Sequence, residues 1–194
     1  MTGPMTWTVR PETPQDRAAV RAVVAAAFPT PAEADLVEAL RGDAAWVPGL
    51  SMVTEPQVAE PQVAGAPDGG PAEITGVAGY ALATRCRVGG VDALALGPVA
   101  VAPEAQSRGC GGAVVRGVLD AAAARAAGGG ERLVVVLGHP EYYPRFGFVR
   151  ASTLGVSVAF EVPDEALMVM VLDGPGPVPS GPVAYPAPFG VPNP

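Results

Sequence analysis

Residues 94–127 read LALGPVAVAPEAQSRGCGGAVVRGVLDAAAARAA, and the rest of the chain is organised around this stretch. The pattern predicts an apolar strand, a turn of small residues and an Ala-rich helix. Gly109 and Gly111 stand where the helix begins, so backbone N–H groups without side-chain cover meet the positive end of the helix dipole there. Such a place favours an anion, and we predict that this turn binds a phosphate group.

Two common phosphate-binding motifs do not match the turn. A Walker A loop needs a lysine after its last glycine, and the sequence contains no lysine. A dinucleotide-binding fingerprint needs a third glycine at position 114, where the chain has Val114. It also needs an acidic residue at the end of the next strand, which instead ends in Leu137-Gly138-His139. We therefore exclude both of these nucleotide sites.

The pattern that remains is Gln106-x-x-Gly109-x-Gly111 after an apolar strand, and it resembles the coenzyme A pyrophosphate loop of the GNAT acyltransferase superfamily. A second motif, YYPRFGF at residues 142–148, resembles the short helix of that family that ends in Gly-Phe. Residues 138–143, GHPEYY, are similar to the bacterial YhbS-like branch of the family. The two motifs occur in the order and at the distance that the family has.

The resemblance implies that the chain uses acetyl-CoA as co-substrate and needs no metal. The turn would hold the pyrophosphate, and the backbone of the preceding strand would hydrogen-bond the pantetheine arm. Cys110 could also be a covalent acyl carrier, since helix N-terminal donors lower a thiol pKa, but its place beside the pyrophosphate favours a packing role. The cofactor-binding residues implied are Val99, Val101, Gln106, Arg108, Gly109, Cys110, Gly111 and Gly112.

Acyl transfer from a thioester to an amine needs a proton donor for the departing thiolate and a neutral amine. The resemblance places Tyr143 as the acid, and a phenol with a pKa near 10 is protonated at neutral pH. The lone histidine, His139, is the candidate base, because it follows the strand that should flank the thioester. Glu33, Glu38 and Asp92 compete with it for that role, and water could carry the proton instead.

The fold expected from the resemblance is of the α/β (α+β) class. It has a mixed, mostly antiparallel central sheet of about six or seven strands, with helices on both faces and one splayed parallel strand pair. Pro98 cannot donate a ladder hydrogen bond, so we expect the strand at 91–101 to splay from the strand at 133–137. The resemblance covers a domain at 5–173 with a Pro/Gly-rich loop insertion at 56–73.

The remaining elements follow from hydrophobic periodicity and turn residues. Helices are expected through 18–28, 33–41 and 112–127, and strands at 7–10, 49–55, 74–88, 91–101 and 132–137. A Gly89-Gly90 turn should join two of the strands. Two further strands, at 154–161 and 166–172, should form an antiparallel closing pair. Residues 174–194 have the composition of an extended Pro/Gly-rich tail, whose Tyr185 and Phe189 either latch onto the domain or stay without contacts.

Composition limits the partners. The formal net charge is −7 and no basic stripe occurs, so we expect no nucleic-acid binding. No apolar run suits a membrane span and no leader segment is recognised, so we expect a cytoplasmic protein without a membrane partner. Two cysteines make neither a disulfide framework nor zinc spacing.

The sequence thus predicts an N-acetyltransferase whose acceptor is a small-molecule or peptide amine. The acids Glu33, Asp35 and Glu38 of the second helix could orient that amine, or they could form an ordinary solvated face. A non-catalytic acyl-CoA sensor on the same fold is the alternative. The acyl chain length, and whether the chain forms a homodimer, stay open.

Overall fold

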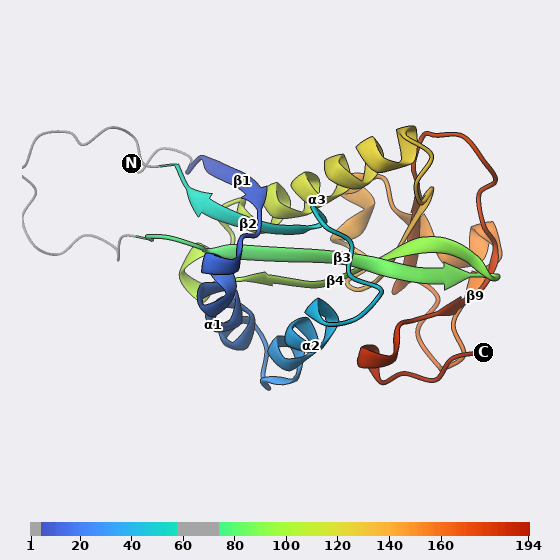
Figure 1. The fold of residues 1–194 in the computed structure, drawn as a ribbon, viewed down its shortest axis with the longest axis horizontal. Helices are drawn as coiled ribbons and strands as arrows, with labels where there is room; N and C mark the ends of the chain where they lie inside the picture. The colour runs from blue at the N-terminus through green and yellow to red at the C-terminus, as the bar shows by residue number, and fades with distance from the viewer. Residues whose placement is uncertain (1–4, 58–73) are drawn as a thin grey trace, which may run out of the picture.

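The structure is a computed structural model that describes residues 5–57 and 74–194. Residues 58–73 of the expected loop insertion therefore lie outside the described residues. A mixed sheet crosses the molecule, and helices cover both of its faces (Figure 1). This arrangement is the expected α/β (α+β) fold.

The sheet follows the strand order β1-β2-β3-β4-β5-β8-β6, and along this path β4 and β5 are the parallel pair. Two further strands lie off the path: β9 pairs antiparallel with β3 and parallel with β7. The strands are β1 (Trp7–Pro11), β2 (Ser51–Pro56), β3 (Gly79–Val88), β4 (Val91–Val101), β5 (Leu133–Leu137), β6 (Val149–Arg150), β7 (Val156–Ser157), β8 (Leu167–Val171) and β9 (Gly181–Ala184).

Helix α3 (Cys110–Ala127) lies on one face of the sheet, and α1 (Arg17–Ala27) and α2 (Ala32–Arg41) lie on the other (Figure 1). Both faces carry apolar cores, because β3 buries side chains on both sides, and a third buried cluster contains Cys86, Val88 and Val183 of β9. The core under α3 contains Val114, Val118 and Leu94, and the core under α1 and α2 contains Val20 and Leu40. Short 3-10 helices are η1 (Pro14–Asp16), η2 (Pro103–Ala105), η3 (Tyr143–Phe146), η4 (Ala151–Leu154) and η5 (Ala187–Phe189).

The expected hairpin turn is confirmed, since Val88 pairs with Val91 across Gly89 and Gly90. Both glycines have positive φ, 56° and 82°, as a two-residue turn of this twist requires. The preceding strand is shorter than expected: it begins at Gly79 rather than at Ile74. Gly76, with φ 73°, turns the chain out of the extended conformation before that point.

The expected antiparallel pairing of 154–161 with 166–172 is wrong. Strand β8 pairs with β5 on one side and with β6 on the other. The residues right after Phe148 thus take the edge of β8, with Val149 opposite Val169. Residues 151–154 form η4, and Gly155 has a positive φ of 67° that ends the helix. The short β7 that follows pairs with β9 instead.

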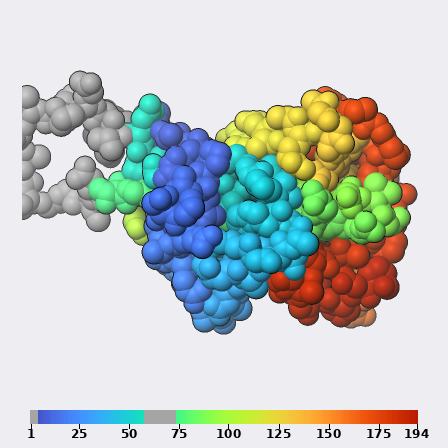
Figure 2. Space-filling view, in the orientation of Figure 1, coloured from blue at the N-terminus to red at the C-terminus, as the bar shows by residue number. Residues whose placement is uncertain are grey.

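The segment 174–194 lies against the domain. Strand β9 buries Val183 completely, and the Gly89 backbone N–H donates to the Pro182 carbonyl at 3.0 Å. Figure 2 shows the red C-terminal segment next to the blue of α2 and the green β3–β4 hairpin. The Asn193 side chain accepts a hydrogen bond from the Tyr185 backbone N–H at 2.8 Å and donates to the Tyr185 carbonyl at 3.1 Å. Tyr185 and Phe189 are therefore held against the body of the protein.

Within residues 5–57 and 74–194, the helices are too short or too polar to cross a lipid bilayer.

Candidate active site

The site lies where β4 and β5 separate. The two strands pair at Leu94↔Val134 and Ala95↔Val135. Beyond Ala95, β4 stays with β3, where the register shifts between Ala81 and Ala83 opposite Gly97 and Pro98. Pro98 thus sits at an irregularity of the β3–β4 pairing, and the β4–β5 pairing on the other side of the strand has already ended at Ala95. The separation leaves backbone groups of β4 facing a gap.

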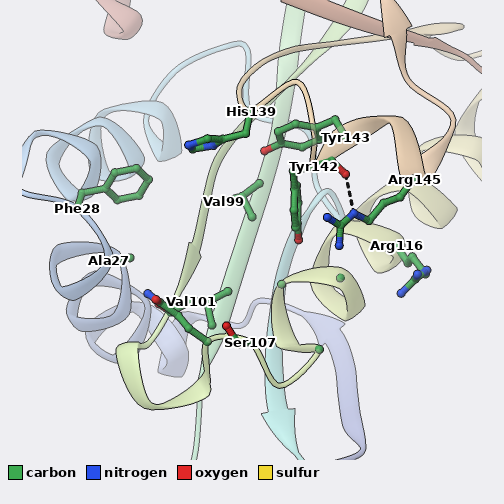
Figure 3. Close-up of a pocket in the computed structure, with 14 residues that line it drawn as sticks. Ala27, Phe28, Val99, Val101, Ser107, Arg116, His139, Tyr142, Tyr143 and Arg145 are labelled. Atoms are coloured by element: carbon green, nitrogen blue, oxygen red, sulfur yellow. Dashed lines mark hydrogen bonds between the residues drawn. The ribbon is translucent and has the colours of Figure 1, made fainter. Parts of the chain in front are cut away.

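A first cavity of about 710 Å³ extends from this gap to the beginning of α3 (Figure 3). Residues from α1, β4, the turn before α3, α3 itself and η3 surround it. The described lining residues are Ala27, Phe28, Val99, Val101, Gln106, Ser107, Gly109, Gly111, Gly112, Arg116, His139, Tyr142, Tyr143 and Arg145. Six of the eight predicted cofactor-binding residues line this cavity, and so do Tyr143 and His139. The fold therefore brings both sequence motifs to one cavity.

The turn before α3 is shaped for close approach of a ligand to the backbone. Ser107 and Gly109 have positive φ values of 58° and 87°. The Trp7 indole N–H donates to the Arg108 carbonyl at 2.8 Å, which fixes the turn against β1. A Cβ at position 111 would lie 2.9 Å from the Tyr142 hydroxyl and 3.2 Å from a Val101 methyl group, so a side chain here would have to displace the cavity wall. The first N–H groups of α3 consequently have no side chain in front of them at this point.

Arg108 and Cys110 do not line this cavity. The Arg108 guanidinium lies 3.6 Å from the Met5 sulfur. The Cys110 side chain is 1% exposed and packs against Gly79, and burial raises the pKa of its thiol to about 12. A protonated, buried thiol is a poor nucleophile, so the geometry gives no support to the covalent alternative.

Tyr142 and Tyr143 enter the cavity at different ends. Their rings meet edge to face, with centroids 5.1 Å apart. In Figure 3 the Tyr143 hydroxyl points to the space near His139 and Val99, whereas Tyr142 extends toward the beginning of α3. Tyr143 is 7% exposed, and burial, with a further contribution from Tyr142, raises the pKa of its phenol to about 12. This hydroxyl therefore stays protonated at any ordinary pH.

A second cavity, of about 380 Å³, adjoins the first. Phe28, Val99, His139 and Tyr143 line both cavities, so the two meet at the end of β5. The rest of the second cavity comes from α2, the diverging strands and the C-terminal segment. These lining residues are Glu33, Leu36, Ala95, Leu96, Gly97, Pro98, Val135, Leu137, Gly138, Phe160, Tyr185, Phe189 and Val191.

The structure separates the acidic residues that the sequence left as rivals. Glu33 lines the second cavity, and its carboxylate accepts a hydrogen bond from the Thr30 hydroxyl at 3.4 Å. Asp35 pairs with Arg21 and Glu38 pairs with Arg41, both away from the cavities. Asp92 pairs with Arg87 at 3.3 Å and lines a different hollow beside the β3–β4 hairpin. His139 and Glu33 are therefore the candidates that the fold brings to the site.

Sequence reasoning missed two arginines of the first cavity. Arg116 lies over the Phe146 ring, 5.4 Å from its centroid. Arg145 lies over the Tyr142 ring at 4.4 Å and donates from Nε to the Tyr142 carbonyl at 2.8 Å. Position 116 is four residues after Gly112, so helical spacing could have placed it on the face of the turn. Both guanidinium groups add positive charge beside the exposed N–H groups.

The described residues contain no group of three or more His, Cys, Asp or Glu side chains placed to hold a metal ion.

The similarity of this chain to known proteins is found among solved structures. No protein-family model matches the sequence, and no curated protein matches it. Solved structures do match. The chain is similar to the GNAT family N-acetyltransferase YhbS from Escherichia coli in complex with CoA, at 25% identity over 98% of this chain and 96% of that one, with a TM-score of 0.77.

It is also similar to a GNAT family acetyltransferase from Brucella melitensis in complex with acetyl-CoA, at 29% identity over 95% of this chain and 98% of that one, with a TM-score of 0.66. The ribosomal-protein-S18-alanine N-acetyltransferase from Escherichia coli matches at 13% identity over 88% of this chain and 97% of that one, with a TM-score of 0.55, and it supports the fold alone.

Proposed function

Because this chain is an acyltransferase with the fold of the GNAT N-acetyltransferases, we propose that it transfers an acetyl group from acetyl-CoA to a primary amine. The transfer is direct, in a complex that holds both substrates. One observation carries the proposal: the first cavity joins the uncovered N–H groups at the beginning of α3 to the buried Tyr143 hydroxyl at the β4–β5 separation. Helix dipole and donors suit a pyrophosphate, and the phenol suits a leaving thiolate.

The residues of the first cavity fit coenzyme A. The N–H groups of residues 109–112 would bind the pyrophosphate, for which Gly111 leaves room. The guanidinium groups of Arg116 and Arg145 would add charge-assisted hydrogen bonds to phosphate oxygens. Backbone groups of Val99 and Val101 would hydrogen-bond the pantetheine arm, as a neighbouring strand does in a sheet.

The proposed chemical step uses Tyr143, His139 and the β4 backbone, which lie near the junction of the two cavities. The amine nitrogen uses its lone pair to form a bond to the thioester carbonyl carbon, and the C–S bond breaks with its electron pair going to sulfur. The Tyr143 hydroxyl gives its proton to that sulfur, and His139 accepts the proton that the amine loses. Backbone N–H groups on the separated part of β4 would stabilise the developing oxyanion.

The test is turnover with acetyl-CoA and a broad panel of amines. Thiol release shows that the thioester is cleaved, and mass spectrometry of the amine shows where the acetyl group goes. Calorimetry measures acetyl-CoA binding separately. A protein that binds acetyl-CoA, yet releases no thiol with any amine, would be a sensor, and the proposed transfer would be refuted.

A further inference from the structure

The second cavity lies on the far side of the shared residues from the turn that would bind pyrophosphate. Phe28, Val99, His139 and Tyr143 form the boundary between the two cavities. If the thioester reaches Tyr143 from the first cavity, the second cavity offers an attacking amine an approach from the other side of the shared residues. The body of that amine then occupies a space whose walls can be read from the structure.

The walls of the second cavity are mostly apolar and partly aromatic. Tyr185 lies between Phe160 and Phe189, with ring centroids 6.4 Å and 5.2 Å away. Val191 and Leu137 complete this side, and Leu137 is 45% exposed although it is a large apolar residue. The two hydrogen bonds between Asn193 and the Tyr185 backbone hold the aromatic wall in place. An exposed apolar wall of this kind suits an apolar ligand.

The charge in the second cavity is negative. Among the described residues that line it, Glu33 is the carboxylate, and no lysine or arginine is present. A carboxylate at the rim attracts an ammonium group and repels an anion. The same carboxylate argues against an acyl chain as the occupant, because a purely apolar chain would desolvate Glu33 without giving it a partner.

We propose that the second cavity binds the acceptor, a small primary amine that carries an aromatic body, and that the C-terminal residues 185–191 determine this specificity. The amine nitrogen lies at the shared boundary near His139, and the aromatic body lies against Tyr185 and Phe189. This inference rests on the proposed acetyl transfer, and it adds the class of acceptor. Amines with polar bodies, and amines with a carboxylate beside the nitrogen, are poor acceptors.

The experiment compares three amines at saturating acetyl-CoA: phenethylamine, ethanolamine and phenylalanine. The first has the aromatic body, the second replaces it by a hydroxyl, and the third keeps it but adds a carboxylate. We expect kcat/KM for phenethylamine to exceed the other two by at least about tenfold. Calorimetry with CoA-saturated protein measures phenethylamine binding without turnover.

Two variants test the wall from opposite sides. Phe189→Ala should raise the KM for phenethylamine at least about tenfold, with the KM for acetyl-CoA unchanged. Val191→Trp adds bulk to the wall of the second cavity and should raise the KM for phenethylamine at least about tenfold, with acetyl-CoA binding in calorimetry unchanged. Val178→Ala is the matched control, because Val178 is an exposed apolar residue of the same segment that does not line the cavity. Thermal unfolding shows that each variant is folded.

The outcomes separate this inference from the transfer itself. Equal turnover of ethanolamine and phenethylamine, or a Phe189→Ala variant with unchanged KM, would overturn the acceptor class and leave acetyl transfer standing. Octanoyl-CoA used in preference to acetyl-CoA, with the preference lost in Phe189→Ala, would show that the cavity holds an acyl chain and would also overturn it. Binding of phenethylamine that depends on Phe189, without thiol release, would support the cavity assignment and refute transfer.

Discussion

Tyr142 and Tyr143 are adjacent in the sequence, but the fold sends their hydroxyl groups to different places. Tyr143 points to the junction of the two cavities, and Tyr142 approaches Gly111 at the beginning of α3. Counting along the motif from the Gly147-Phe148 pair favours Tyr143 as the proposed acid, but the sequence alone could not show where each hydroxyl points in the cavity. The difference makes the two tyrosines natural controls for each other.

Tyr143→Phe should lower kcat about 100-fold, because it removes the proposed proton donor for the thiolate and keeps the ring. The KM for acetyl-CoA should change less than about twofold, since the hydroxyl lies away from the α3 end of the cavity. Steady-state kinetics of Tyr143→Phe and Tyr142→Phe provide the measurement.

The pH profile adds an independent check on this residue. Burial raises the pKa of Tyr143 to about 12, so the phenol stays protonated and kcat should not fall between about pH 8 and pH 10 because of this group. Wild-type kcat in Tyr143→Phe, or a 100-fold loss in Tyr142→Phe instead, would show that the acid is assigned to the wrong ring.

Gly111→Glu should abolish acetyl-CoA binding in calorimetry. A Cβ at this position would lie 2.9 Å from the Tyr142 hydroxyl and 3.2 Å from a Val101 methyl group, and the added carboxylate would repel phosphate. Gly42→Glu is the matched control, because a Cβ there meets the Ala39 carbonyl at an ordinary 3.7 Å. Undiminished binding by a folded Gly111→Glu protein would mean that the pyrophosphate binds elsewhere.

At the scale of elements, turns and single helices could be predicted from the sequence, because they depend on residues that are neighbours in the chain. The Gly89-Gly90 turn, the Ala-rich helix and its glycine-rich beginning all follow from residues close together in the chain. The partner of β8 could not be predicted in this way, since Val149 and residues 154–161 compete for the same edge and only the packed sheet selects between them. The sequence left open whether Tyr185 and Phe189 contact the domain, because the composition of residues 174–194 resembles an extended tail and only the packed structure brings them to Phe160.

The entrance to α1 gives a prediction at this scale. Asp16 forms a capping box with Thr13 and accepts two hydrogen bonds from Arg10, at 2.7 Å and 2.8 Å. The Arg10 guanidinium, aided by Thr13, holds the pKa of the Asp16 carboxyl well below its usual range. A lowered pKa contributes stability above the unfolded value of about 3.9, and this contribution is lost as pH falls toward the folded value.

Asp16→Asn should therefore lower the free energy of unfolding by about 1–3 kcal/mol at pH 7. The difference from the wild type should shrink as pH falls below about 4. Urea unfolding followed by circular dichroism at several pH values measures both effects. Asp35→Asn is the control, because its exposed pair with Arg21 should contribute less than about 1 kcal/mol. A constant difference at all pH values would contradict the assigned role of Asp16.

At the scale of the whole molecule, both cysteines are buried in apolar clusters: Cys110 in the core under α1 and α2, and Cys86 in the cluster that includes Val183 of β9. Cys86 is 3% exposed and Cys110 is 1% exposed, and burial raises the pKa of each thiol to about 12. We expect neither thiol to react with a disulfide reagent in the folded protein, and both to react in denaturant. Rapid labelling of the native protein, read by absorbance against a Cys110→Ala variant, would contradict the observed packing.

The separation of β4 from β5 has a consequence for how tightly the protein is held together. Backbone hydrogen bonds between neighbouring strands stabilise a sheet along its whole length. Here the parallel strands β4 and β5 stop pairing at Ala95. A ligand lying along Val99 and Val101 would form backbone hydrogen bonds that β5 does not form with this part of β4. The enzyme should therefore resist heat better as the concentration of its acyl donor rises, since the substrate completes part of its architecture.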